Sequence, residues 1–239
     1  MRAALEARGL TKRYGQREAL RALDLRVAAG ELVALVGENG AGKTTALAML
    51  SGQLVPDEGQ ALIGGHDVFG EPIAARGQLG YVAQDLLLPP YLTVDEMVAF
   101  VCGVKRRAVE PVLLEALLAL AGLATDADRL IGELSHGMQR KAAWITALVA
   151  EPAVLVLDEG LAGLDASSSA ALVQQVAQRM AQGSAVLWAE HDLEPIAPHL
   201  SRVVVLHGGR LAEEMSGDAL REEWAAGRLS QLQQRWTTP

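Results

Sequence analysis

This 239-residue sequence has one cysteine, few aromatic residues and more acidic than basic residues. Each of these features argues against a class of structure or ligand. The single cysteine, Cys102, excludes an internal disulfide and suits a reducing compartment. Aromatic residues make up 4% of the chain, too few for the stacking platforms that bind single-stranded nucleic acid. The formal net charge of −8 argues against broad binding to a phosphate backbone. We therefore expect no nucleic acid partner.

Long uninterrupted apolar runs are also missing. Glu115 interrupts the run 111–124, and Glu151 ends the run that follows Trp144, so neither reaches the roughly 20 residues that span a bilayer. The first eight residues lack the apolar core of a signal peptide. We therefore expect a chain that stays in the cytosol. Half of its residues are hydrophobic, enough to bury a sizeable core.

What the sequence does contain is an alternation of β-favouring runs and helical segments. The early apolar residues alternate loosely and meet turns at Gly15 and Gly30, which predicts antiparallel strands. The run 154–157 shows no polar alternation, as in a parallel strand covered on both faces. Further periodic segments predict helices over 43–50, 110–121 and 166–181, and strands over 60–63, 186–189 and 203–206, with a hairpin turn at 208–209.

Strands that alternate with helices predict an α/β fold with a mainly parallel sheet, an N-terminal antiparallel β subdomain and an inserted helical lobe. We expect one domain over 1–239. Its core would comprise 1–84 and 151–239, and the helical lobe would comprise 85–150.

A glycine-rich loop between a strand and a helix carries the strongest chemical signal. Its glycines let backbone N–H groups surround phosphate oxygens, and the following helix points its positive dipole end at the anion. Lys43 would reach the β- and γ-phosphates of a nucleoside triphosphate, and the Thr44 hydroxyl would bind Mg²⁺. The loop is a complete Gly-x-x-x-x-Gly-Lys-Thr phosphate-binding motif, formed by Gly37, Glu38, Asn39, Gly40, Ala41, Gly42, Lys43, Thr44 and Thr45.

Two adjacent carboxylates follow the apolar run 154–157. A strand that ends in Asp158 and Glu159 presents them at the carboxyl edge of the sheet, where nucleotides bind in such folds. Asp158 would contribute to the Mg²⁺ shell, and Glu159 could polarise the attacking water. Asn39 is the only asparagine, so guanine recognition through Asn-Lys-x-Asp is excluded. On these two motifs alone, recombination-type and motor ATPases remain possible.

A third segment reads Leu-Ser-His-Gly-Met-Gln-Arg-Lys over 134–141. Together with Asp158–Glu159 and the lone His191 after a strand, it resembles the signature of the ATP-binding cassette (ABC) family. The resemblance covers nearly the whole chain, with several motifs in the family's order. It implies a cytosolic ATPase with ATP and Mg²⁺ as its cofactors.

The resemblance assigns further residues to the nucleotide. Tyr14 matches the aromatic residue that stacks on adenine, and Gln84 matches the glutamine that touches Mg²⁺ and leads into the helical lobe. Ser135 and Gly137 match signature groups that contact the γ-phosphate of ATP held by the opposite subunit. His191 matches the switch histidine, which would hydrogen-bond the γ-phosphate.

The segment Gly163, Leu164 and Asp165 resembles the loop through which two subunits communicate, and Asp165 can also cap the following helix. Three positions depart from the family's usual pattern. His136 stands where glycine is common, Met138 where glutamine is common, and Gly160 follows Glu159 where proline is frequent. If Ser135 is the helix N-cap, His136 needs no special backbone geometry. The glycine at 160 is expected to loosen the turn after Glu159.

The family resemblance also implies partners. A head-to-tail homodimer or heterodimer with another ABC ATPase subunit would complete each nucleotide site, with Glu159, His191 and Gln84 as the catalytic set. A separate integral membrane permease would dock near the apolar run 85–94 and place the chain on the cytoplasmic face of the membrane. The short single cassette looks more like an exporter subunit. The alternatives are a soluble non-transport ABC ATPase and a weakly hydrolysing subunit of a heterodimer.

Overall fold

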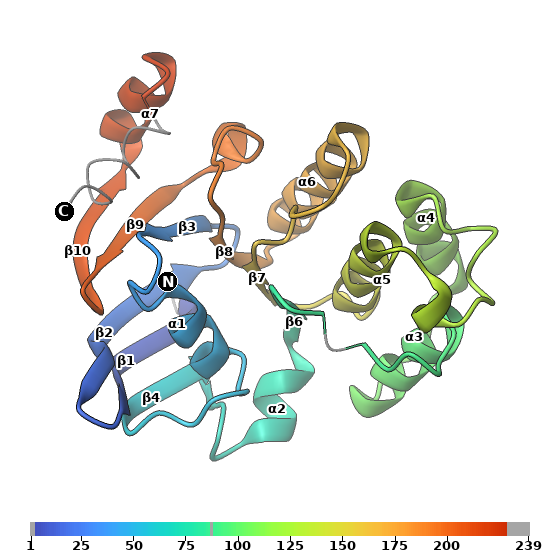
Figure 1. Ribbon diagram of the computed structural model, residues 1–239, viewed down its shortest axis with the longest axis horizontal. Coiled ribbons are helices and arrows are strands. Elements are labelled where there is room, and N and C mark those ends of the chain that lie inside the picture. Colours follow the sequence, from blue (N-terminus) through green and yellow to red (C-terminus); the bar gives the residue numbers. More distant parts are fainter. Residues whose placement is uncertain (1–2, 87, 229–239) are drawn as a thin grey trace.

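The computed structural model describes residues 3–86 and 88–228, and its strands form two sheets (Figure 1). The antiparallel sheet has the order β2-β1-β4-β5 and contains β1 (Ala3–Tyr14), β2 (Arg17–Ala28), β4 (Glu58–Ile63) and β5 (His66–Asp67). The larger sheet has the order β10-β9-β3-β8-β7-β6 and contains β3 (Leu32–Gly37), β6 (Leu79–Val82), β7 (Val154–Asp158), β8 (Ala185–Ala189), β9 (Arg202–His207) and β10 (Arg210–Ser216). Its neighbouring strands are all parallel except β10, which forms a hairpin with β9.

Helices cover both faces of the larger sheet, and the first of them packs between the two sheets (Figure 1). The α-helices are α1 (Lys43–Leu50), α2 (Pro72–Gly77), α3 (Val94–Val104), α4 (Pro111–Ala121), α5 (His136–Leu148), α6 (Ala166–Ala181) and α7 (Gly217–Ala225). Two 3₁₀ turns, η1 (Ile131–Glu133) and η2 (Ala197–His199), lie in the connections. No helix in the described ranges is long and apolar enough to cross a membrane.

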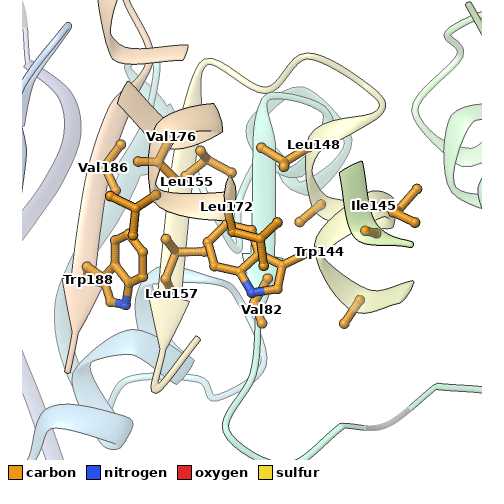
Figure 2. Close-up of a cluster of buried hydrophobic side chains, with 14 of the residues drawn as sticks. Val82, Trp144, Ile145, Leu148, Leu155, Leu157, Leu172, Val176, Val186 and Trp188 are labelled. Atoms are coloured by element: carbon orange, nitrogen blue, oxygen red, sulfur yellow. The ribbon is translucent and has the colours of Figure 1, made fainter. Parts of the chain in front are cut away.

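The strands of the parallel sheet are buried on both faces, as the sequence predicts for 154–157. Along β7, Leu155 and Leu157 pack in one hydrophobic cluster with α5 and α6, whereas Val154 and Val156 pack in a second cluster with α1. Side chains alternate between the faces of a strand, so a strand buried on both faces needs an unbroken apolar run. Figure 2 shows the first cluster, which includes Leu157 and the indole rings of Trp144 and Trp188.

The second cluster fixes α1 against both sheets. Leu47 and Leu50 of α1 are fully buried among side chains of β1, β3 and β4. Because α1 follows β3 directly, this packing holds the loop 38–42 at the carboxyl end of β3. The carboxyl ends of β7 and β8 lie at the same edge because β3, β8 and β7 are parallel neighbours.

Local capping signals set the ends of several helices. Asp165 caps α6 by accepting a hydrogen bond from the Ser168 N–H at 2.8 Å, and Gly122 ends α4 in the left-handed conformation. The predicted helices over 43–50, 110–121 and 166–181 are therefore confirmed to within a residue. Strand β6 and helices α2 and α3 were not predicted individually. The division into 1–84, 85–150 and 151–239 stays a prediction, although α3, α4 and α5 all fall within 85–150.

Candidate functional site

The glycine-rich loop adopts a conformation that only glycine can supply at two of its positions. An added Cβ at Gly37 would lie 2.3 Å from the carbonyl oxygen of Leu206. At Gly42, which has φ +106°, a Cβ would lie 2.5 Å from the carbonyl oxygen of Ala19. The backbone of the loop therefore lies in close contact with β9 and β2 immediately before α1 begins.

The loop forms one wall of an open cavity of about 420 Å³. Lys43 projects into it and donates hydrogen bonds to the carbonyl oxygens of Gly37 at 2.7 Å and Glu38 at 3.1 Å. Burial lowers the pKa of Lys43, while Glu159, Asp158 and Glu38 oppose that shift. An ammonium group beside a helix N-terminus favours an anionic ligand. The cavity is lined by Tyr14, Arg17, Ala19, Asn39, Gly40, Gly42, Lys43, Thr44, Thr45, Gln84 and Glu159.

Below this cavity, Asp158 has an unusual environment for a carboxylate. It is 2% exposed, and its Oδ2 has no hydrogen-bond partner among the described residues. Burial raises the pKa of Asp158, and a hydrogen bond with the Thr44 side chain opposes that shift. An unpartnered buried carboxylate oxygen is costly unless a cation or donor meets it.

These residues fit Mg²⁺. A hydroxyl, an amide and a carboxylate are all oxygen donors, the kind that Mg²⁺ prefers, and Thr44, Gln84 and Asp158 supply one of each. Thr44 and Gln84 both line the cavity, and Thr44 hydrogen-bonds Asp158. The described residues contain no cluster of three or more His, Cys, Asp or Glu side chains suited to a metal, so this mixed set is the candidate site.

Glu159 and His191 lie together beside the cavity. Glu159 Oε1 is 2.9 Å from His191 Nε2, and the histidine side chain is about half exposed. The two residues follow neighbouring strands, β7 and β8, which end at the same edge of the sheet. A carboxylate that is held by an imidazole and opens to solvent is suited to accept a proton from water.

Other predicted residues lie outside the cavity. Ser135 is the N-cap of α5 and accepts a hydrogen bond from the Met138 N–H at 3.3 Å, so His136 is the first helical residue, as expected. A Cβ added at Gly137 would lie 3.3 Å from the Gly163 carbonyl oxygen, and Lys141 Nζ lies 3.6 Å from Asp165 Oδ2. The signature segment and the 163–165 segment of one chain are therefore in contact.

Comparison with known proteins decides the family. The sequence model of the ABC transporter family matches residues 20–162. The chain belongs to the ABC transporter family. The P-loop NTPase fold and the ATPase class that the sequence motifs indicate are thereby confirmed.

Individual ABC relatives agree with this assignment. The chain is 36% identical over 223 residues to the sulfate/thiosulfate import ATP-binding protein CysA of Methylococcus capsulatus, an alignment that covers 90% of this chain and 64% of that relative. It is 35% identical over 228 residues to the Nod factor export ATP-binding protein I of a Rhizobium species, covering 92% of this chain and 73% of that relative. A solved ATP-binding subunit of an ABC transporter superposes with a TM-score of 0.84 at 27% identity and 93% coverage of both chains.

The ABC cassette contains residues near the site that the sequence motifs did not indicate. Arg140 of α5 is buried, and its guanidinium donates to the carbonyl oxygens of Ala83 at 2.8 Å and Gln84 at 2.9 Å. Arg17 lines the cavity and donates to the carbonyl oxygen of Gly40 at 3.4 Å. The contact partner of Arg17 is a backbone carbonyl, which leaves no pattern in the sequence.

The expectation that Gly160 loosens the turn after Glu159 is not what the structure shows. The indole Nε1 of Trp144 donates to the Gly160 carbonyl oxygen at 2.8 Å, within the buried core. The ring fills the space above the glycine, since a Cβ there would lie 2.9 Å from Trp144 Cζ2. A packed and hydrogen-bonded side chain from α5 therefore supports this turn.

Proposed function

We propose that the chain is the ATP-binding and ATP-hydrolysing subunit of an ABC transporter that works with a separate membrane permease. The observation that carries this proposal is the Glu159–His191 pair, 2.9 Å apart, beside a cavity that contains Lys43, Thr44 and Gln84. Hydrolysis of a γ-phosphate requires a base for the attacking water, a group that orients this base, and a phosphate-binding site beside them. The cavity brings candidates for all three together.

The nucleotide is bound by groups with separate tasks. Backbone N–H groups of the 37–42 loop and the Lys43 ammonium surround the phosphates, and the exposed ring of Tyr14 stacks on the adenine. Thr44, Asp158 and Gln84 would hold Mg²⁺, which would supply positive charge to the phosphate oxygens. Glu159 accepts a proton from the attacking water, and His191 orients Glu159 and hydrogen-bonds the γ-phosphate.

A second subunit completes each site. Ser135 and Gly137 do not line the cavity of their own chain, so they are available to a nucleotide held by a facing cassette. A two-fold, head-to-tail pair would bring the start of α5 to the γ-phosphate of the partner. Residues 163–165 touch the start of α5 and would report the state of one site to the other. ATP closes this pair, and hydrolysis opens it.

A groove between α2 and α3 is proposed as the permease contact. It has a volume of about 400 Å³, and Ile73, Phe100 and Val104 along it are each more than half exposed. Its charged lining residues, Arg76 and Lys105, are both basic. We assign it to a short cytoplasmic helix of the permease that presents apolar side chains and an acidic residue. The neighbouring run 85–94 contributes Leu86, Leu88 and Leu92 to core packing, and Leu87 lies outside the described residues.

Replacing Phe100 with Glu is expected to lower recovery of the permease by about tenfold, because a charge would be buried against an apolar helix. The measurement is affinity capture of the tagged chain from detergent-solubilised membranes of its own cells, with the multi-spanning protein quantified. Val112→Glu is the matched control, since Val112 is also exposed but lies on α4 outside the groove. Equal recovery with both variants would place the permease elsewhere, and recovery of no membrane protein by the unaltered chain would favour a soluble ATPase.

Replacing Tyr14 with Ala is expected to raise the Kd for ATP by about tenfold, the usual loss when a base–aromatic stack is removed. Tyr14→Phe should bind ATP as well as the unaltered chain, because it keeps the ring. Titration calorimetry in the absence of turnover measures both. An unchanged Kd for the alanine variant would remove Tyr14 from the adenine site.

The proposed function is tested by steady-state hydrolysis of Mg-ATP, with the chain alone and with its captured permease. Turnover that rises when the permease is present supports a transporter subunit. A pair that forms but never hydrolyses ATP would instead favour the weakly hydrolysing subunit of a heterodimer. Export stays a prediction, since relatives at 36% and 35% identity are named for import and for export.

A further inference from the structure

The turn after β7 holds Glu159 in a backbone conformation that its surroundings must impose. Glu159 has φ +48°, in the left-handed region that non-glycine residues rarely adopt. Its N–H donates to the Ala189 carbonyl oxygen at 2.8 Å, and its own carbonyl oxygen accepts a hydrogen bond from the Ala162 N–H at 3.1 Å across the turn. Residues that persist in such conformations do so because neighbouring groups fix them.

One of these neighbours comes from α5. Trp144 is fully buried, and its indole N–H donates to the carbonyl oxygen of Gly160 at 2.8 Å. Any side chain at position 160 would collide with the Trp144 ring, because the added Cβ would lie 2.9 Å from Cζ2. The ring therefore requires glycine at position 160, and the hydrogen bond fixes the Gly160–Leu161 peptide, one peptide beyond Glu159.

The opposite flank of the turn is held from β8. Glu190 is buried, and its Oε2 accepts hydrogen bonds from the Leu161 N–H at 3.4 Å and the Trp188 indole at 3.2 Å. Its Oε1 accepts a hydrogen bond from the His191 N–H at 3.1 Å. The rings of Trp144 and Trp188 also pack together, with centroids 5.6 Å apart at 58° (Figure 2). The turn is therefore held by the sheet on one flank and by α5 on the other, so a shift of α5 relative to the sheet would distort it.

We propose that Trp144 is a positioning residue that links the location of α5 to the location of the Glu159 carboxylate. Helix α5 begins next to Ser135 and carries Trp144 two turns later, so a displacement of its start reaches Gly160 through one rigid helix. This inference rests on the proposed function, in which Glu159 is the base and the start of α5 faces the nucleotide of a partner. When the start of α5 binds the nucleotide held by the partner subunit, Trp144 would then position Glu159 in the nucleotide site of its own chain.

The test compares Trp144→Phe with the unaltered chain in steady-state ATP hydrolysis. Phenylalanine keeps an aromatic ring in the core but removes the indole N–H, so kcat is expected to fall by about tenfold as Glu159 loses its position. The KM for ATP should stay within about twofold because the phosphate loop is untouched. Ile145→Ala is the control for lost packing, because Ile145 is buried on the same helix and has no role in the proposed site. This variant should have a lower Tm and an unchanged kcat.

A double-substitution cycle makes the link specific. Gly160→Ala is expected to lower kcat by about tenfold beside Trp144 but by less than twofold in the Trp144→Phe background, where the colliding ring atom is gone. Trp144→Phe with normal kcat, or effects of the two substitutions that simply add, would overturn the inference. The inference would also be overturned if Ile145→Ala and Trp144→Phe had the same Tm and the same loss of kcat. Glu159→Gln separates this outcome from failure of the proposed function: if that variant still turns over, Glu159 is not the base.

Discussion

Glu159→Gln is expected to lower the ATP turnover of the chain by about a thousandfold while it still binds Mg-ATP. General-base catalysis contributes roughly 10² to 10⁴ in rate, and a thousandfold loss corresponds to about 4 kcal/mol of barrier. Glutamine fills the same space and can hydrogen-bond His191, but its amide cannot accept the proton of the attacking water. The phosphate loop, Lys43 and Thr44 are unchanged, so ATP affinity should be preserved.

The same variant is expected to accumulate as an ATP-dependent dimer. If ATP closes the pair of cassettes and hydrolysis opens it, a chain that binds without hydrolysing has no route back to the monomer. Gel filtration in ATP and in ADP measures this directly, alongside phosphate release. His191→Ala is the informative companion, because it leaves the carboxylate and removes its partner 2.9 Å away, so it should slow turnover by a smaller factor.

Two results would contradict this prediction. Turnover within tenfold of the unaltered chain would exclude Glu159 as the base. Loss of turnover without any ATP-dependent dimer would keep the catalytic assignment and reject the head-to-tail arrangement proposed for Ser135 and Gly137. The Kd for ATP, measured on the same sample, excludes a trivial loss of binding.

The features that sequence reasoning predicted correctly are encoded within short stretches. The glycine loop of 37–45 lies between a buried strand and α1, as its motif requires, because glycines, lysine and threonine act within nine consecutive residues. Strand β7 is buried along its whole length and ends in Asp158, as its apolar run indicates. The cap of α6 by Asp165 depends on a serine only three residues away. Such features need no knowledge of the rest of the fold.

The features that were missed depend on contacts between distant segments. Arg140 hydrogen-bonds carbonyl groups 57 and 56 residues before it, and a backbone carbonyl leaves no pattern in the sequence. Trp144 resembles any apolar core residue until its partner is known. Strand β6 contains Gly80, and a glycine in a run of four residues argues against a strand. A Cβ there would lie 2.4 Å from the carbonyl oxygen of Ala147, so close packing of α5 requires the glycine.

Asp158→Asn is expected to change stability and catalysis in opposite directions. Asp158 is a buried carboxylate whose Oδ2 has no partner among the described residues. Burial raises the pKa of Asp158 despite the hydrogen bond with Thr44 and the nearby charge of Lys43. A carboxyl with a raised folded pKa binds a proton more readily in the folded state, so its contribution to stability is lost as pH rises through that value.

Removing this charge should therefore stabilise the protein at neutral pH when no metal is bound. The expected gain is about 1 kcal/mol, or roughly 2–4 °C in Tm for a chain of this length. The difference should shrink as pH falls below the pKa of an unfolded aspartate, where the unaltered residue is also neutral. Thermal unfolding with EDTA measures it, and Glu115→Gln, which removes an exposed charge on α4, is the control.

The same substitution should lower turnover by about a hundredfold and shift the Mg²⁺ dependence to higher concentrations, because an amide oxygen is a weaker ligand than a carboxylate for a hard cation. A Mg²⁺ titration of ATP hydrolysis measures this effect. A less stable metal-free variant would mean that the carboxylate supports the fold, and an unchanged Mg²⁺ titration would remove Asp158 from the metal site. Gain of stability together with loss of turnover would show that the buried charge is retained for its ligand, because the fold alone is better without it.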